Sequence, residues 1–431
     1  MPNVDPADDL LAYIAASPTP WHCVAETARR LEAAGYRALD ERDRWALAAG
    51  DRVYVVRGGS SILALEIGTV PPSEGGFRLV GAHTDSPNLR VKPRGLTTAH
   101  GVHQLAVEPY GGVLLHTWLD RDLSIAGRVV LRTSRGIAPA LVRIERPIAR
   151  IPSLAIHLDR TVNEDGLRLN AQTHLAPLIA LASAGELRLG ELLAEAAGAG
   201  SADAVLGYDL CLYDTLPPAR GGARGELIFA PRLDNQASCH AALSALLSAA
   251  PGARPTRGIV LYDHEECGST SAQGATSPFL GDVLERVARA RDDASDAYAR
   301  ALARSFLISA DMAHGVHPNY ADKHEPGHRP MLGAGPVLKS NSNQRYATDG
   351  EGWARFANWC ARADVVPQHF VTRSDLACGS TIGPLSAARL GVRTVDVGNP
   401  MLSMHSCREM AAAADVAPMI AVMRAFFESE D

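Results

Sequence analysis

Several features that mark whole classes of protein are scarce in this sequence of 431 residues. Lys and Arg number 42 against 48 Asp and Glu, and no basic stripe stands out. We therefore expect no nucleic-acid partner, because phosphate binding needs clustered cations. No apolar run reaches the ~18 residues that a membrane span requires. The seven cysteines are scattered without a CxxC pair, which favours a reduced, intracellular compartment over a disulfide framework.

The N-terminus shows no targeting pattern. Residues 1–5 are acidic and lack the positive start and apolar core of a signal peptide, so we expect a cytoplasmic protein without membrane contact. Hydrophobic residues make up 46% of the chain, which is enough to build the cores of two or more domains.

The order of apolar runs predicts an α/β domain with a mainly parallel sheet. Strand-like runs alternate with helical patterns, as in strand–helix–strand units. Asp5 and Pro6 predict the start of a first helix, because Asp caps helices and Pro is tolerated in their first turn. The strand-like runs are 53–56, 61–67, 77–81, 227–229, 258–262, 306–309, 337–339, 369–371 and 394–397. Further helical patterns cover 21–34, 237–249, 283–290, 352–363 and 415–427.

The middle of the chain departs from this pattern. It starts with short β-rich pieces punctuated by glycine and continues with an Ala- and Leu-rich stretch near 175–197 that we expect to be helical. We interpret 95–225 as a β-rich domain inserted into the first one. Residues 1–94 and 226–431 are then expected to form one discontinuous α/β domain.

Two short motifs suggest a metal site with its own base. Glu265 and Glu266 follow an apolar run, and adjacent side chains at a strand end point to opposite faces, since side chains alternate with period two. One acid can then hold a metal while the other moves a proton. His83 and Asp85 end another apolar run and lie two residues apart, so both can face the same way.

Several imidazole and carboxylate side chains fall just past strand ends, where open α/β sheets place their ligands. Such a mixture suits zinc or a similar divalent ion. Asp234 lies between a strand and a helix and has two oxygens that can bridge a pair of ions. The residues that can fill two neighbouring metal sites are His83, Asp234, Glu266, Asp311 and His405.

Each of these residues also has an ordinary structural explanation. A single Asp after a strand is usually a turn former or helix cap, and a single His is usually hydrogen-bonded or exposed. Spacing alone cannot bring together residues that span more than three hundred positions. The histidines at 314, 317, 324 and 328 are interpreted as parts of a structural loop, and Cys267 as a small buried apolar residue.

Other catalytic patterns are absent. There is no H-E-x-x-H helix, and the Gly-rich piece at 221–225 does not match a phosphate-binding loop. Ser403 and Ser406 flank His405, but no nucleophile-elbow motif surrounds them.

Longer motifs resemble the aspartyl aminopeptidase family of metallopeptidases nearly end to end. The likeness lies in the residues at 17–22, 81–87, 145–152 with 155–158, 230–235, 309–314 with 317–320, 343–346 and 404–406. In letters the central pieces are GAHTDSP, APRLDN, SADMAH and MHS. Together they are specific, whereas any one of them alone is weak.

The resemblance implies a two-domain subunit and a homo-oligomer. A proteolytic α/β domain carries a dinuclear zinc site, with manganese or cobalt as substitutes, and the inserted domain mediates dimerisation within a tetrahedral dodecamer. The activity implied is removal of an N-terminal Asp or Glu from peptides. Which peptides, which of the two residues and which metal are not implied.

The resemblance also assigns roles. His83, Asp234, Glu266, Asp311 and His405 match metal ligands, with Asp234 bridging, and Glu265 matches the general base. Asp85 matches the acid that orients His83. Lys339 and Tyr346 match substrate-recognising positions.

His157 matches a histidine that reaches the active site of a neighbouring subunit. We favour a substrate contact for it, with zinc ligation as the alternative, because five other ligands already fill two sites. His264 and Cys267 depart from the Asn and aliphatic residue that family members often have beside the Glu pair. That departure bears on metal preference or pH response rather than on the reaction.

The implied mechanism is metal-assisted peptide hydrolysis with Glu265 moving the proton. Two other functions stay open on the residues alone. A dinuclear zinc amidohydrolase acting on small N-acyl amino acids would use the same ligand types. A non-catalytic assembly scaffold would keep the fold, although the loss of a ligand or of Glu265 expected there is not seen.

Overall fold

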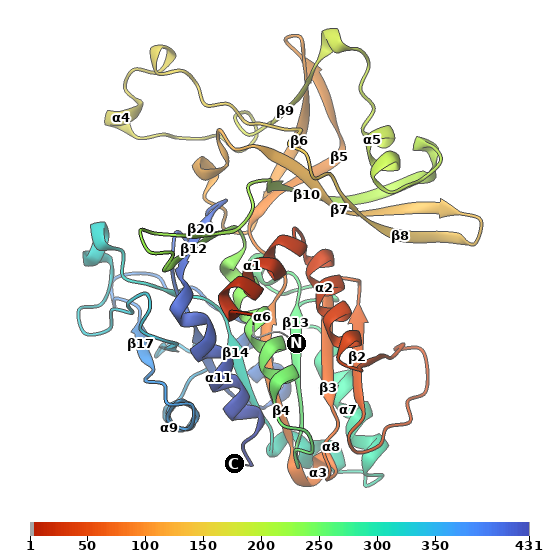
Figure 1. Ribbon diagram of the computed structural model, residues 1–431, viewed down its shortest axis with the longest axis vertical. Coiled ribbons are helices and arrows are strands. Elements are labelled where there is room, and N and C mark those ends of the chain that lie inside the picture. The colour runs from red at the N-terminus through yellow and green to blue at the C-terminus, as the bar shows by residue number, and fades with distance from the viewer. Residues whose placement is uncertain (1–3, 431) are drawn as a thin grey trace. The chain divides into compact units, whose positions relative to one another are not determined.

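The computed structural model describes residues 4–430 and divides the chain into two compact units (Figure 1). The first unit comprises residues up to Asp85, Pro218–Met404 and Glu409 onward, and the second comprises Ser86–Pro217 and His405–Arg408. The second unit thus starts and ends somewhat before the expected 95–225 and also takes in a short segment far along the chain. Each unit is described by itself.

A nine-stranded sheet with the order β1-β2-β3-β13-β4-β14-β18-β16-β17 forms the centre of the first unit. Its middle strands β13, β4, β14 and β18 run parallel to one another, whereas β3 and β16 pair in antiparallel fashion with their neighbours β13 and β18. The strands are β1 Arg37–Ala38, β2 Arg52–Arg57, β3 Ser61–Glu66, β13 Thr256–Tyr262, β4 Phe77–His83, β14 Phe306–Ala310, β18 Arg393–Gly398, β16 Val337–Ser340 and β17 Gln368–Val371.

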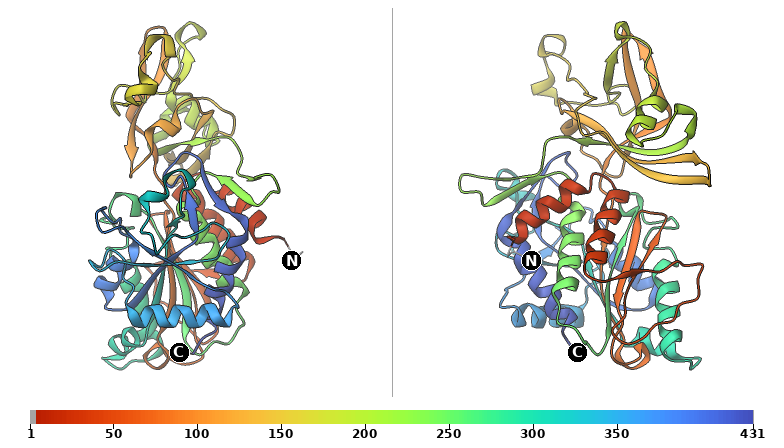
Figure 2. Two further views of the ribbon diagram at one scale, coloured as in Figure 1. Left: turned by 90° about the vertical axis from the view of Figure 1, so that its left-hand side faces the viewer. Right: turned by 45° about the vertical axis from the view of Figure 1, so that its right-hand side comes forward.

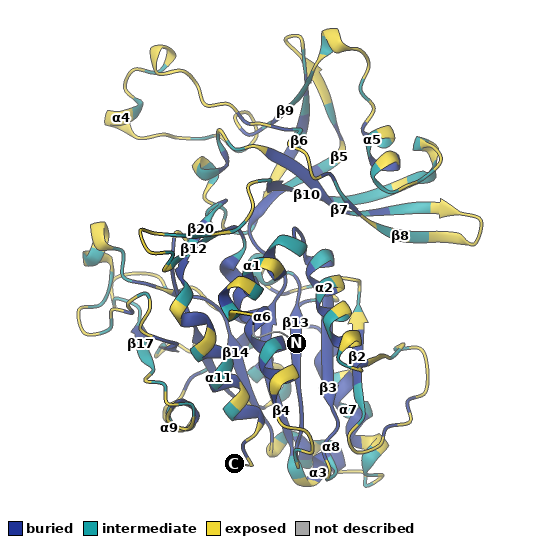
Figure 3. Cartoon of the chain, in the orientation of Figure 1, coloured by how far each residue is buried: buried dark blue, intermediate teal, exposed yellow. Residues whose placement is uncertain are grey.

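The middle strands are buried on both faces, as parallel strands covered by helices must be. Every residue of β4, β13 and β14 is buried, and Figure 3 shows them dark blue along their length. Ile259 and Leu261 belong to one hydrophobic cluster, whereas Val260 and Tyr262 belong to the other. This alternation follows from the period of two and divides the sheet into two packed faces.

Helices cover both faces and give a three-layer α/β/α unit, with strands between helices in the side view of Figure 2. One face packs against α1 Pro6–Ala16, α2 Pro20–Ala33, α6 Leu233–Ser248, α9 Gly350–Arg362 and α11 Val416–Phe427. The other packs against α7 Phe279–Arg291, α8 Ala297–Ala303 and α10 Ile382–Leu390, while α3 Pro72–Gly75 precedes β4. The predicted start of the first helix is confirmed, since the Asp5 carboxylate accepts the Ala7 N–H and Pro6 is its first residue.

A smaller five-stranded sheet completes the first unit. Its order is β11-β12-β20-β19-β15, with β11 Ala219–Gly221, β12 Leu227–Ala230, β20 Glu409–Ala412, β19 Pro400–Leu402 and β15 Ala313–His314. Ile228, Ala230 and Met401 from these strands pack with α1 and the start of α6 in one cluster. The sheet thereby carries the chain from β12 into the first turn of α6.

The second unit is built on an antiparallel six-stranded sheet with the order β8-β7-β10-β5-β6-β9. Its elements are β5 Asn88–Ala99, β6 Val102–Tyr110, β7 Leu123–Thr133, β8 Gly136–Arg143, β9 Leu178–Leu181, β10 Val205–Asp214 and helices α4 Val162–Asp165 and α5 Leu189–Ala196. The expectation of a helix over 175–197 is wrong for its first half. Leu178–Leu181 forms β9, because it pairs with the neighbouring strand β6. The helix of this stretch, α5, begins only at Leu189.

Among the described residues, no helix combines the length and the apolar character needed to cross a bilayer.

The ionisation of the buried Asp415 should make the stability of the first unit depend on pH. Asp415 precedes α11, and its carboxylate accepts the N–H groups of Gly333 and Gly335 at 2.8 Å each. Burial raises the pKa of Asp415 from 3.8 to about 6, although the two hydrogen bonds oppose the rise. Because the folded-state pKa is the higher one, the stabilising effect of protonation is complete below about pH 4 and is lost as the pH rises through 6.

Asp415→Asn, which cannot ionise, should therefore gain stability relative to the wild type as the pH rises from about 4 to 7. A shift of about two pKa units corresponds to roughly 3 kcal/mol. Thermal unfolding midpoints across this range measure the difference, with the exposed Asp322→Asn as the matched control. A constant offset between Asp415→Asn and the wild type at every pH would contradict the prediction.

Candidate metal centre

The carboxyl ends of three neighbouring strands define the candidate site. β4 ends at His83, which lies beside Tyr262, the last residue of β13. Asp311 follows directly after β14, the other neighbour of β4. The parallel register therefore brings residues that are far apart in sequence to one edge of the sheet, as the general rule for open α/β sheets requires.

Four of the five predicted ligands lie together at this edge. His83 Nε2 is 3.4 Å from Asp234 Oδ1 and 3.7 Å from Asp311 Oδ1. His83, Asp234 and Asp311 are all buried and could hold one ion between them. His83 also forms a second such group with Glu265 and Glu266, whose ligand atoms all lie within 4.8 Å of one another. The two groups share His83, so the geometry offers overlapping sets of oxygen and nitrogen donors.

Asp234 reaches the site because α6 is irregular at its start. Arg232, the residue before the helix, has a left-handed backbone with φ 58°, and Asp234 itself has φ −83° and ψ 103°, outside the helical region. The Asp234 N–H donates to Glu409 Oε2 at 3.1 Å. A regular first turn would have pointed this carboxylate along the helix surface, whereas the irregular turn directs it at His83.

Asp85 contacts both His83 and the turn that carries Glu265 and Glu266. Its carboxylate oxygens accept the N–H groups of Glu265 at 3.2 Å and Glu266 at 3.1 Å. His83 Nδ1 lies 3.0 Å from the main-chain oxygen of Asp85 and 3.4 Å from its Oδ1. Asp85 therefore orients the imidazole and also anchors the turn that carries the two glutamates.

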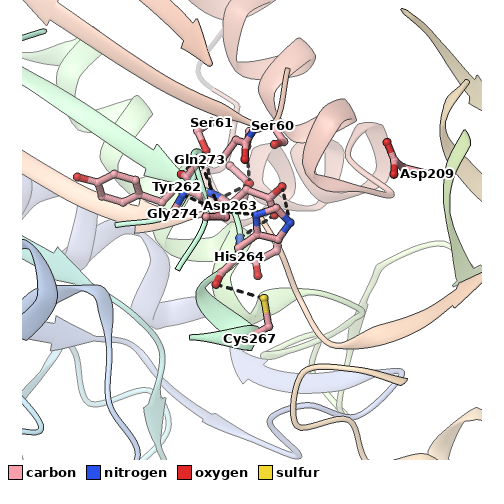
Figure 4. A network of polar contacts seen from close by, with 12 residues as sticks. Ser60, Ser61, Asp209, Tyr262, Asp263, His264, Cys267, Gln273 and Gly274 are labelled. Atoms are coloured by element: carbon pink, nitrogen blue, oxygen red, sulfur yellow. Dashed lines mark hydrogen bonds and ion pairs between the residues drawn. The ribbon is translucent and has the colours of Figure 1, made fainter. Parts of the chain in front are cut away.

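A second set of contacts fixes the residue before the glutamates (Figure 4). His264 has a left-handed backbone with φ 66°, its N–H donates to Asp263 Oδ1 at 2.8 Å, and its Nδ1 lies 2.8 Å from Ser271 Oγ. The Asp263 N–H donates to Ser61 Oγ on β3. The prediction that Cys267 is buried is wrong: it is exposed, because the turn after Glu266 leads the chain out to solvent.

Closely spaced carboxylates dominate the electrostatics of the site. Burial raises the pKa of Glu265 to about 8, and the neighbouring aspartates add to the rise. Burial likewise raises the pKa of Glu266 well above its usual value. Burial alone would lower the pKa of His83, but hydrogen bonds to Asp234, Asp311 and Asp85 raise it well above its usual range. The donor set is thus rich in negative charge that a divalent cation would compensate.

Lys339 and Tyr346 lie beside Asp311. Lys339 is buried on β16, and its Nζ donates to the main-chain oxygens of Asp311 at 2.9 Å and Met312 at 3.2 Å. The same ammonium lies 5.1 Å from the centre of the Tyr346 ring, a cation–π contact. Two of the three N–H donors of the Lys339 ammonium are therefore used by main-chain oxygens, one of which belongs to the ligand candidate Asp311.

A pocket of about 330 Å³ opens next to Tyr346. His314, Lys323 and Arg373 contribute polar side chains to its lining, and Phe370 and Met404 contribute apolar ones. Burial and the nearby Lys339 lower the pKa of His314. The sequence interpretation treated His314 as part of a structural loop; the signal that could have singled it out is its position just after the ligand candidate Asp311.

His157 and His405 belong to the second unit. His157 lies in a short exposed 3₁₀ turn, Ile156–Leu158, flanked by the exposed Leu154. His405 has a left-handed backbone with φ 69°, and its Nδ1 lies 3.0 Å from the Gly112 oxygen within that unit. The roles assigned to these two histidines stay predictions from the sequence.

Comparison with known proteins identifies the family. The model for aminopeptidase I zinc metalloproteases, family M18, matches residues 13–427. The chain belongs to the M18 family of zinc metalloproteases. A probable M18 family aminopeptidase 2 of Pseudomonas aeruginosa is 52% identical over 427 residues, with 98% of each chain covered.

Solved structures agree with this assignment. The structure of the Ape4 and Nbr1 complex matches with a TM-score of 0.95 and 40% identity over 98% of this chain and 85% of that one. The M18 aminopeptidase of Thermotoga maritima matches with a TM-score of 0.85 and 26% identity over 98% of this chain and 95% of that one. The S. cerevisiae mApe1 dodecamer matches with a TM-score of 0.87 and 29% identity over 98% of this chain and 96% of that one. The chain is therefore an M18 metalloaminopeptidase with the α/β fold of that family.

The electrostatics predict that cation binding competes with protons. Glu265 with a pKa of about 8, together with Glu266 and His83 with raised pKa values, carries protons near pH 7 in the cation-free protein. These protons must leave before the groups can act as ligands or as a base. Zinc binding at pH 7 should therefore release protons, and zinc affinity should fall as the pH drops from about 8 to 6.

Calorimetric titration with zinc in two buffers of different ionisation enthalpy measures the release. Glu266→Gln should weaken zinc binding, whereas the exposed Cys267→Ser should leave it unchanged if that thiol is no ligand. Binding heats that do not depend on the buffer, with a pH-independent affinity, would overturn this account of the site.

Proposed function

We propose that this M18 metalloaminopeptidase uses two divalent cations and removes N-terminal Asp or Glu from peptides. The observation that carries the proposal is the group formed by the buried His83, Asp234 and Asp311 and the half-buried glutamate pair, which offers overlapping donor sets at the carboxyl ends of the strands. These five side chains offer more donor atoms than the about four that a single zinc ion takes, and the surplus favours two neighbouring ions.

The proposed ligands are His83, Asp234, Glu266, Asp311 and His405, with Asp234 bridging. Imidazole and carboxylate donors fit zinc, the metal of the family, and admit manganese or cobalt. When bound, the cations supply a Lewis acid that polarises the scissile carbonyl and lowers the pKa of water towards ~7. The role of His405 rests on the sequence motif Met404-His405-Ser406.

Glu265 is proposed as the general base. It lies next to the ligand candidate Glu266, and burial raises its pKa to about 8. A carboxylate with a raised pKa takes a proton readily, whereas one with an ordinary pKa is too weak a base. Glu265 would take the proton of the attacking water and deliver it to the leaving amine.

Asp85 and Asp263 are proposed to keep that base in place. The N–H groups of Glu265 and Glu266 both donate to Asp85, so the turn cannot rotate without breaking two charge-assisted hydrogen bonds. Asp263 holds the preceding N–H of His264. A displacement of about 1 Å in a catalytic group can cost ~10²-fold in rate, which gives these anchors their importance.

Specificity for an acidic first residue is proposed to come from cationic and polar groups beside Asp311. The 330 Å³ pocket is lined by His314, Lys323, Arg373 and Tyr346. The Lys339 ammonium lies 5.1 Å from the centre of the Tyr346 ring and adds its positive charge next to this lining. His157 is proposed as a substrate contact from a neighbouring subunit, with zinc ligation as the alternative.

Self-assembly is part of the proposal. The S. cerevisiae relative mApe1 is a dodecamer, and we propose for this chain a homo-oligomer built from dimers, in a tetrahedral dodecamer. Leu154, Ile156 and Leu158 are exposed at 64%, 46% and 74%, an apolar stretch around His157 that a second copy could bury.

Glu265→Gln should keep its metal and lose nearly all turnover. The substitution preserves size but removes the proton acceptor, so kcat should fall by roughly 10²–10⁴-fold. Metal analysis and hydrolysis of Asp-4-nitroanilide measure the two effects, with Cys267→Ser as the neighbouring control. Near-wild-type turnover in Glu265→Gln would remove Glu265 from the reaction.

Lys339→Ala should reduce hydrolysis of Asp- and Glu-4-nitroanilides much more than that of the Leu compound. Hydrogen bonds to charged groups contribute about 1.5–3 kcal/mol, which corresponds to a loss of roughly 10–150-fold in kcat/KM for the acidic substrates. The contacts of Lys339 with Asp311 and Met312 make a second outcome meaningful. An equal loss on all three substrates would show that Lys339 only supports the main chain at Asp311.

A further inference from the structure

Arginines gather at the amino ends of the strands of the same nine-stranded sheet. A pocket of about 350 Å³ in the first unit is lined by Arg78, Arg254, Arg304, Arg355 and Arg393. The carboxylates in its lining are those of Glu74 and Glu430. Five guanidinium groups against two carboxylates give the described lining an excess of positive charge on a chain whose net charge is −6, although Glu351 pairs with two of them.

These arginines lie at the amino ends of the strands whose carboxyl ends carry the metal ligands. Arg78 is the second residue of β4, and Arg393 is the first residue of β18. Arg254 and Arg304 each lie two residues before a strand, β13 and β14. A strand rises about 3.3 Å per residue, so Arg78 and His83 are separated by roughly 16 Å along β4. The pocket is thus separate from the metal centre.

The five arginines differ in their partners. Arg355 and Arg393 both pair with Glu351 on α9. Arg78 is buried, and its guanidinium donates to the main-chain oxygens of Arg304 and Glu430. Within residues 4–430, the exposed side chains of Arg254 and Arg304 have neither a hydrogen bond nor an ion pair.

The backbone under these two arginines is held rigidly. Gly76 has φ 70°, and a Cβ there would lie 2.3 Å from the Arg304 oxygen. A Cβ at Gly68 would lie 2.2 Å from the Arg254 oxygen. The chain around α3 therefore packs directly against both arginine backbones, which fixes the positions from which the two side chains extend.

We propose that this pocket binds a small multivalent oxyanion, a phosphate group or the paired carboxylates of an acidic amino acid. Guanidinium groups present planar forks of N–H donors that match the oxygens of phosphate and carboxylate. Arg254 and Arg304 supply these donors, and Arg78 contributes to the lining. The site needs no metal and does not depend on the peptidase reaction.

Calorimetric titration of the full-length protein with inorganic phosphate, and separately with L-aspartate, tests the proposal at constant ionic strength. The wild type should bind at least one of the two saturably. The double variant Arg254→Ala/Arg304→Ala should bind that anion at least 10-fold more weakly, whereas Arg44→Ala, an exposed arginine outside the pocket, should bind it within 2-fold of the wild type.

Arg254→Lys/Arg304→Lys keeps the charge and removes the forks, so its affinity should fall between those of the wild type and the double alanine variant. Binding of phosphate alone or of aspartate alone identifies which oxyanion the pocket takes. Absence of saturable binding, as when a second copy of the chain covers the pocket, overturns the proposal. So does binding that the double alanine variant retains.

Discussion

Negative charge buried at the carboxyl ends of β13, β4 and β14 is the constraint on which the rest of the first unit depends. The buried Asp85, Asp234 and Asp311 and the half-buried glutamate pair surround one imidazole. Like charges so close cannot all ionise in a medium of low dielectric constant unless a cation compensates them. The fold tolerates this edge because the strands behind it are buried along their whole length and pack on both faces.

The same acids give the site its order. Asp85 accepts hydrogen bonds from the turn carrying Glu265 and Glu266 and also lies against His83, so one carboxylate couples the ends of two neighbouring strands. Asp234 is directed into the site by an irregular turn rather than by a regular helix. Donors that are placed before a ligand arrives lose little freedom when it binds, which is the physical content of preorganisation.

Sequence patterns could predict what depends on local physics. The alternation of Ile259, Val260 and Leu261 and the cap at Asp5 follow from side-chain periodicity and from hydrogen bonding within a few residues. The position of candidate ligands past strand ends could also be predicted, because it follows from a rule about parallel sheets. The exposure of Cys267 and the strand at 178–181 could not, because each depends on what the rest of the chain does around it: a turn that leads out to solvent and a free edge on β6.

The role of Asp85 shows the same limit within the site. The family resemblance implies an acid that orients the imidazole of His83, but the two N–H groups that donate to it come from residues about 180 positions away. Lys339 is comparable: the family resemblance implies a substrate contact, whereas its contacts with the main chain of Asp311 and Met312 exist only because β16 lies two strands from β14. Such roles arise from sheet order, which no local pattern encodes.

The two edges of the central sheet carry opposite charge, and distance prevents them from neutralising each other. Arg78 and His83 lie on one strand, separated by roughly 16 Å, which is about twice the Debye length of ~8 Å at physiological ionic strength. Through solvent, the arginine pocket therefore offers little compensation to the carboxylates at the far end of the strand. We therefore expect each end of the strands to bind its own counter-ion, a cation among the carboxylates and an anion among the arginines. The strand between the two ends keeps them apart, so the two binding events should be independent.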